Sequence, residues 1–81
     1  MDTQPWGRPV QFETEAGHFR ILTSSEEASH YLQNNWPGDA GPKFIEAQRA
    51  CLDVLAGAGE PDDARAAFVE ACEEAGLHVV P

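Results

Sequence analysis

The chain has 81 residues, of which 42% are hydrophobic and 23% charged, and fourteen acidic against five basic side chains give it a net charge of −9. This composition excludes wholesale disorder and allows one domain with a small core. The negative charge and the absence of any Lys or Arg cluster argue against binding to nucleic acid or to an anionic membrane.

The cysteine content and the N-terminal composition indicate the compartment. Cys51 and Cys72 fall within predicted helices, so the pattern is not that of a secreted disulfide scaffold. The first twenty residues carry charges and lack the apolar segment of a signal peptide. The longest apolar run, residues 66–69, is far too short to span a membrane. We therefore expect a soluble, cytoplasmic protein.

The N-terminal residues show no periodicity. Residues 1–8 contain Pro and Gly without alternation and are expected to form a flexible arm. Trp6 is the only large apolar side chain of this arm and can attach it to the rest of the chain. Residues 9–81 are predicted to form a single α+β domain.

Two strands are predicted at the start of this domain. Val10 and Phe12 alternate with polar residues, which is the period of a half-buried strand. Residues 18–23 form the second strand, with Phe19 and Ile21 expected to face the core. A short turn separates the two strands, so they should form an antiparallel hairpin.

Three helices follow, and each has a recognisable start. The first begins after Ser24, which forms a capping-box pattern with Glu27. The second begins at Pro42, because Pro is favoured at the first position of a helix. The third runs from Pro61 until Gly76 stops it.

The third helix has two contrasting faces and leads into the last strand, residues 77–80. Small apolar residues and Phe68 recur at helical spacing on one face, and acidic residues lie on the other. The element order ββαααβ predicts a two-layer α+β sandwich. It comprises a three-stranded, mainly antiparallel sheet with the first strand in the middle and three helices on one face. The predicted core consists of Val10, Phe12, Phe19, Ile21, Tyr31, Leu32, Trp36, Phe44, Leu52, Leu55, Phe68, Cys72, Leu77 and Val79.

Short motifs along the chain resemble one bacterial family. They are the helix entry at residues 21–28, Trp36-Pro37, residues 50–55 with Gly57, residues 64–68 and residues 74–76. Together they are similar to the domain of unknown function 982, found in small proteins typical of rhizobia and their relatives, over about residues 10–80. The resemblance implies a small α+β protein without an established activity, substrate or cofactor, so it assigns no catalytic residue.

No catalytic, cofactor-binding or metal-binding residue is predicted. Residues 57–59, Gly-Ala-Gly before a helix, are similar to a phosphate-binding turn, but acidic residues follow and no Lys does, so neither nucleotide fingerprint is met. Those acidic residues lack the spacing of a calcium loop. The three histidines lie on separate elements without a second ligand at helical spacing.

The outer face of the sheet is the main candidate for a binding surface. Alternation places a mixed set of side chains on the strand sides away from the helices: His18, Arg20, Leu22, His78 and Val80, with Gln11 and Glu13 of the first strand beside them. Helices on one face only leave this face open. It is either a solvated sheet face or a protein contact, most simply a homodimer through the sheet faces or through an exposed edge strand.

The leading hypothesis for function is therefore a non-enzymatic protein-interaction or regulatory module, whose partner is a basic protein or a second copy. One alternative is a small enzyme or ligand-binding protein that uses a cysteine or His78 in a shallow pocket. Another is an acidic domain that mimics phosphate and binds a basic partner through one helix face, formed by Asp62, Glu70 and Glu73.

Overall fold

The computed structural model describes residues 5–15, 17–37 and 40–80. They form, in chain order, β1 (Pro5–Glu15), β2 (His18–Ser24), α1 (Ser25–Asn34), α2 (Pro42–Leu55), α3 (Pro61–Glu74) and β3 (His78–Val80). The strand order is β2-β1-β3, and β1 is antiparallel to both of its neighbours. The predicted α+β class, the element order and the central position of the first strand are confirmed.

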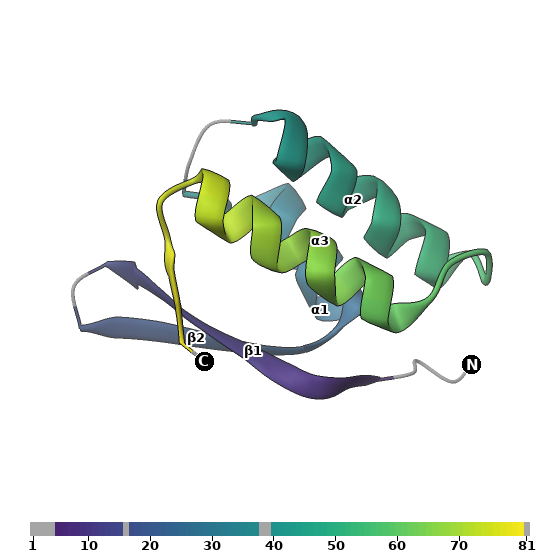
Figure 1. Ribbon diagram of the computed structural model, residues 1–81, viewed down its shortest axis with the longest axis horizontal. Helices are drawn as coiled ribbons and strands as arrows, with labels where there is room; N and C mark the ends of the chain where they lie inside the picture. The colour runs from purple at the N-terminus through teal and green to yellow at the C-terminus, as the bar shows by residue number, and fades with distance from the viewer. Residues whose placement is uncertain (1–4, 16, 38–39, 81) are drawn as a thin grey trace.

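The three helices lie on one side of the sheet (Figure 1). α1 and α3 contact the strands, whereas α2 packs mainly against these two helices and lies farther from the sheet (Figure 1). No helix of the described chain covers the opposite side of the sheet.

The first helix begins where its sequence signal predicts. Ser24 is the N-cap of α1, and its hydroxyl accepts a hydrogen bond from the N–H of Glu27 at 3.2 Å. The Glu27 carboxylate reaches back beyond Ser24 and accepts hydrogen bonds from the N–H and the hydroxyl of Thr23, both at 2.7 Å. In a standard capping box this carboxylate accepts from the N–H of the N-cap residue, which here is Ser24. In this chain it accepts from the preceding residue, Thr23, and so links the end of β2 to the start of α1.

Phe68 of α3 lies at the centre of an aromatic cluster. Four rings surround it at centroid distances of 5.4 to 6.4 Å: Phe12, Trp6, Trp36 and Tyr31. Because these rings come from β1, from α1 and from the chain after α1, one side chain joins the helices to the sheet. The small apolar face predicted for this helix is confirmed, since Ala64, Phe68, Ala71 and Cys72 are buried.

The predicted N-terminal arm is wrong for residues 5–8, which form the first part of β1. Trp6 is only 4% exposed, and its indole N–H donates a hydrogen bond to the hydroxyl of Ser25 at 3.0 Å. The pairing of β1 with β2 is irregular before Val10, so this stretch lacks the alternation that predicts a strand. Residues 1–4 of the predicted arm lie outside the described residues.

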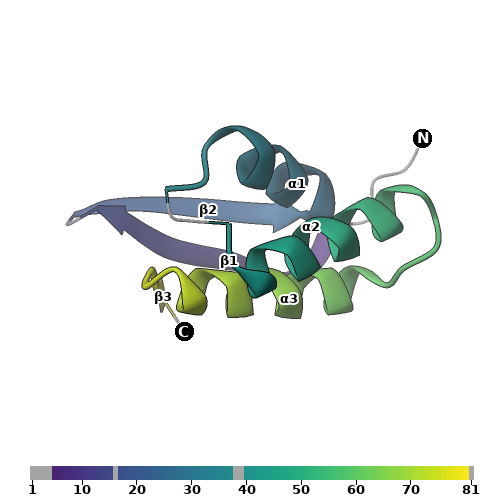
Figure 2. The same ribbon diagram turned by 90° about the horizontal axis from the view of Figure 1, so that it is seen from above.

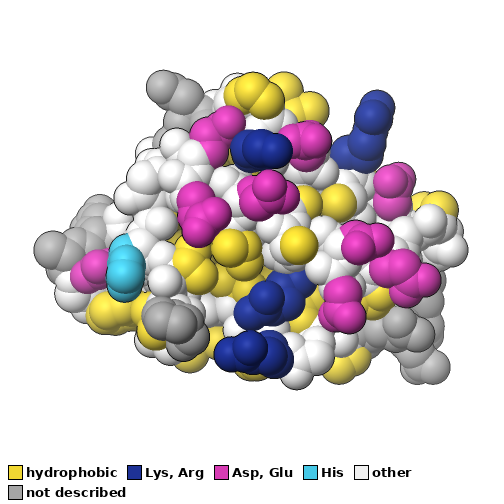
Figure 3. Space-filling model, viewed as in Figure 1, with side chains coloured by type: hydrophobic (Ala, Val, Ile, Leu, Met, Phe, Trp, Pro, Cys, Tyr) yellow, Lys and Arg dark blue, Asp and Glu magenta, His cyan; other side chains and the backbone are white. Residues whose placement is uncertain are grey.

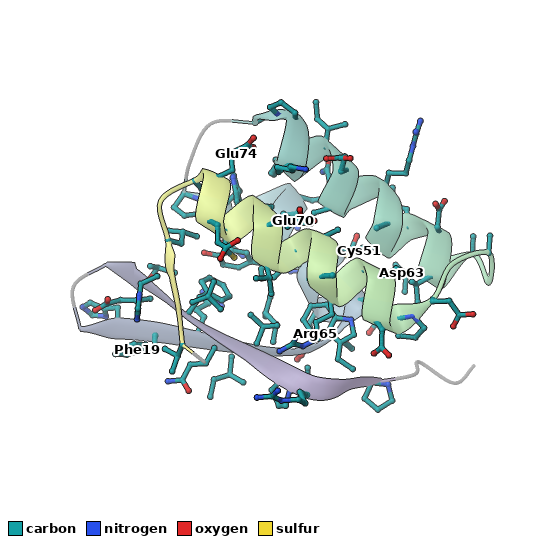
Figure 4. All side chains as sticks on the ribbon, viewed as in Figure 1. Phe19, Cys51, Asp63, Arg65, Glu70 and Glu74 are labelled. Atoms are coloured by element: carbon teal, nitrogen blue, oxygen red, sulfur yellow. The ribbon has the colours of Figure 1, made fainter. Side chains whose placement is uncertain are left out.

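Arg65 of α3 holds the same part of β1 (Figure 4). Among the residues that the structure describes, β3 pairs with residues 11–13 of β1, and the first half of β1 has no strand neighbour on that side. The Arg65 side chain donates a hydrogen bond from Nε to the carbonyl oxygen of Arg8 at 2.8 Å. This side of β1 is therefore partly covered by α3, and β2 presents the longer open edge of the sheet.

The predicted core is correct for most residues and wrong for four. Six of its members are buried and four more pack against them half-buried: Val10, Phe12, Tyr31, Leu32, Phe68 and Cys72, then Trp36, Phe44, Leu77 and Val79. The four exposed ones are Phe19, Ile21, Leu52 and Leu55. α2 buries only Ala47 and Cys51, because it packs on other helices and its small residues make the contact, leaving its leucines outside.

Candidate functional site

The two faces of β2 are the reverse of those predicted. Leu22 is 6% exposed and lies in the core, whereas Phe19 and Ile21 are 51% and 58% exposed. Arg20 is directly opposite the buried Phe12, and opposed residues of an antiparallel pair share a face. Arg20 and Leu22 therefore lie on the helix side of the sheet and do not belong to its outer face.

A β-bulge at Thr14 causes this reversal. Next to the turn, Glu15 lies opposite His18, but the following pair is Glu13 opposite Phe19, so Thr14 is an extra residue on β1. A shift of one residue moves every side chain of a strand to the other face. Without the bulge, Phe19 would face the core as the alternation predicts.

The outer face is more apolar than predicted. It consists of opposed residues from all three strands, which we call the outer sheet patch: Gln11 and Glu13 of β1, Phe19 and Ile21 of β2, and His78 and Val80 of β3. Four predicted residues lie on it, namely Gln11, Glu13, His78 and Val80, and His18 is exposed at the turn. Figure 4 shows Phe19 at the sheet, on the other side of the molecule from α2.

The patch carries little of the negative charge of the chain. Its carboxylate, Glu13, accepts a hydrogen bond from the N–H of Gly17 at 2.8 Å and lies opposite His78. Most acidic side chains belong to the helices, and Figure 3 shows them spread over α2 and α3 with Lys and Arg among them. Electrostatic repulsion between two copies is therefore weakest at the sheet.

The predicted acidic helix face is exposed but partly neutralised. Asp62, Glu70 and Glu73 lie on the outside of α3. The Nζ of Lys43 in α2 lies 3.4 Å from a carboxylate oxygen of Glu46 and 3.6 Å from one of Glu70. Hydrogen bonding to Glu46 and the charges of both carboxylates raise the pKa of Lys43. The middle of the predicted acidic row is therefore paired with a cation.

The structure does not bring together the residues that the alternative function, a thiol enzyme, requires. Cys51 of α2 and Cys72 of α3 are fully buried, while His78 is exposed on the outer face. Burial raises the pKa of Cys51 to about 11 and that of Cys72 to about 12, so both thiols are protonated at neutral pH. Within residues 5–80 as described, no group of three or more His, Cys, Asp or Glu side chains could hold a metal ion.

Both thiols are expected to react with a disulfide reagent at pH 8 at least about 100-fold more slowly in the folded protein than in urea, because their raised pKa lowers the thiolate fraction and burial blocks access. Absorbance after addition of dithionitrobenzoate measures this rate. Fast reaction of one thiol in the folded protein would instead favour the thiol enzyme.

A groove between β2 and α1 was missed by the sequence analysis. Its volume is about 310 Å³, and it is lined by Arg20 and Leu22 of β2 and by Glu26, Glu27, His30, Tyr31 and Asn35. The Arg20 guanidinium lies 5.3 Å from the centre of the Tyr31 ring, a cation–π distance. Four of the lining residues on α1 recur at helical spacing and therefore share one side of the helix. The sequence does not show that this side faces a groove, because that depends on Arg20 and Leu22 lying on the helix side of β2.

The ends of the groove carry opposite charges. Arg20 lies at the Tyr31 end, and Glu26 and Glu27 lie in the first turn of α1, next to Thr23. Hydrogen bonds from the hydroxyl and the N–H of Thr23 lower the pKa of Glu27, so this carboxylate is charged at neutral pH. The groove therefore has a cationic end and an anionic end.

Comparisons with known proteins bear on the whole domain. The family model described as "Protein of unknown function (DUF982)" matches residues 8–79. Comparisons with curated proteins and with solved structures find no match. Among the described helices, none is both long enough and apolar enough to cross a bilayer.

Proposed function

The chain belongs to the DUF982 family, whose function is unknown, and from this starting point we propose that it is a non-enzymatic protein-interaction module that self-associates through the outer sheet patch. The observation that carries the proposal is the exposure of Phe19 and Ile21 on a sheet face without a covering helix in the described chain. Large exposed apolar side chains that lie together are typical of protein contacts.

A second copy is the partner that the surface fits best. In a two-fold symmetric contact both copies use the same patch, so Phe19 and Ile21 of each copy lose exposed area. Complete burial of one such side chain contributes about 1.5 to 3 kcal/mol. The net charge of −9 opposes association in general, but the acidic helices lie away from this face. The protonated, buried thiols support a function without nucleophilic catalysis.

Sedimentation velocity tests this proposal with two matched variants. Ile21 and Ile45 are equally exposed, at 58% and 59%, but Ile21 lies in the outer sheet patch and Ile45 on α2. We expect the wild type to sediment as a dimer, Ile21→Glu as a monomer and Ile45→Glu as a dimer, because a carboxylate is costly only in the buried contact.

Two outcomes would overturn the proposal. One is a wild type that stays monomeric up to about 1 mM, since a dissociation constant of that size corresponds to only about 4 kcal/mol of binding free energy. The other is a reversed pattern, in which Ile45→Glu dissociates the dimer and Ile21→Glu does not. That pattern would place the contact on the exposed apolar side of α2.

A further inference from the structure

β2 has an open edge. Within the described part of the chain it is the outermost strand of the sheet and pairs with β1 alone. The N–H of Thr23 donates to Glu27 of α1, so it points away from β1. Alternate residues of an extended strand direct their N–H and C=O groups to the same side, and those of Phe19 and Ile21 therefore face the open edge. Such an edge is a template for a further strand.

The groove described above lies along this edge. Figure 2 shows α1 beyond β2, on the side away from β1 and β3. The groove is lined by the inward side chains of β2, Arg20 and Leu22, and by one side of α1. A strand added to the edge would lie beside α1 and would place every second side chain in the groove. The edge and the groove thus form one site for an extended segment.

We propose that the occupant is β2 of a second copy, paired antiparallel about a two-fold axis at Ile21. This proposal rests on the self-association proposed above and specifies its geometry. In this register Ile21 lies opposite its own copy, and Arg20 lies opposite Leu22 of the second copy. The two sheets then form one continuous sheet. The outer patches of both copies lie side by side on one face of it and meet at the two opposed Ile21 side chains.

The opposite charges at the two ends of the groove favour a second copy as the partner, and they favour this register. Arg20 of each copy enters the anionic end of the other groove, next to Glu26, and the symmetry makes this contact twice. Glu26 forms no ion pair with another residue of the described part of the chain, so it is free to receive the guanidinium. If the two-fold axis lay at Arg20 instead, the guanidinium groups of the two copies would lie directly opposite each other, which is unfavourable.

Mixing two charge variants tests the pairing. Arg20→Glu places a carboxylate next to Glu26 of the other copy, and Glu26→Arg places two guanidinium groups together. We therefore expect each variant alone to dimerise at least about tenfold more weakly than the wild type. An equimolar mixture should form a heterodimer of about wild-type affinity, because both contacts then join opposite charges. Native mass spectrometry distinguishes the heterodimer by its mass.

A cysteine scan tests the register. With oxidised glutathione, Ile21→Cys should form a disulfide-linked dimer, since directly opposed Cα atoms lie about 5.5 Å apart. Phe19→Cys is the control, because its copy would lie four residues away, about 14 Å along the strand, and should not be linked. Sheets packed face to face lie about 10 Å apart and would link neither variant.

The outcomes separate the two proposals. A wild type without self-association overturns both. A dimer that Ile21→Glu dissociates, but that neither charge variant weakens and that Ile21→Cys does not link, overturns the edge pairing alone. Recovery of the dimer in the mixture together with linkage of Ile21→Cys supports it.

Discussion

Phe68→Ala is expected to lower the free energy of unfolding by about 3 to 5 kcal/mol, which is most of the stability that a domain of this size has. The Phe68 ring is fully buried and contacts four aromatic rings, so its removal leaves a cavity that relaxation of rings from different elements fills only in part. Urea unfolding followed by far-UV circular dichroism measures the loss. Tryptophan fluorescence provides a second probe, because Trp6 and Trp36 lie within 6.0 Å of Phe68.

Phe19→Ala is the matched control for this prediction. The chemical change is the same, but Phe19 lies half-exposed on the outer sheet face, so the monomer should lose less than about 1 kcal/mol. If the two substitutions shifted the urea midpoint equally, Phe19 would be a core residue and the faces of β2 would be those that simple alternation predicts.

The helices were predictable because their signals are local. The capping box at Ser24 and the prolines at positions 42 and 61 mark the starts of the three helices, and the structure begins them there. The small apolar face of α3 was predictable for the same reason, since residues three and four apart share a helix face whatever surrounds it. The element order then limits the topology to a few arrangements.

The faces of β2 were not predictable, because they depend on one extra residue in another strand. Phe19, Ile21 and Leu22 are all apolar, and a strand cannot bury adjacent residues on one face. The bulge at Thr14 decides between them, and nothing in the residues around it distinguishes a bulge from a regular pair. The choice is made by packing, in which Leu22 rather than Ile21 joins the core.

The residues of the candidate site depend on which face of β2 is buried. The sequence predicts a candidate surface on the open side of the sheet, but alternation assigns Arg20 and Leu22 to that side, where the structure has Phe19 and Ile21. Once Arg20 is on the helix side, it contacts Tyr31 and forms the cationic end of the groove. The outer sheet patch and the groove are therefore two consequences of the same bulge.

Trp6→Ala is expected to cost about 3 to 5 kcal/mol, the second large effect, because the indole is buried in the core and packs 5.9 Å from the Phe68 ring. Urea unfolding followed by far-UV circular dichroism measures it. A cost below about 0.5 kcal/mol, as for a surface residue, would mean that residues 5–8 are the flexible arm that their composition predicts.

A double-mutant cycle with Ser25 separates the packing of Trp6 from its hydrogen bond. Trp6→Phe keeps an aromatic ring but removes the donor, whereas Ser25→Ala leaves the buried indole N–H without its acceptor, which costs about 1 to 3 kcal/mol. The double variant Trp6→Phe, Ser25→Ala has neither polar group. It should therefore cost less than the sum of the two single changes, by about 0.5 kcal/mol or more. Additive costs would mean that the bond at 3.0 Å contributes nothing and that apolar packing alone holds β1 to α1.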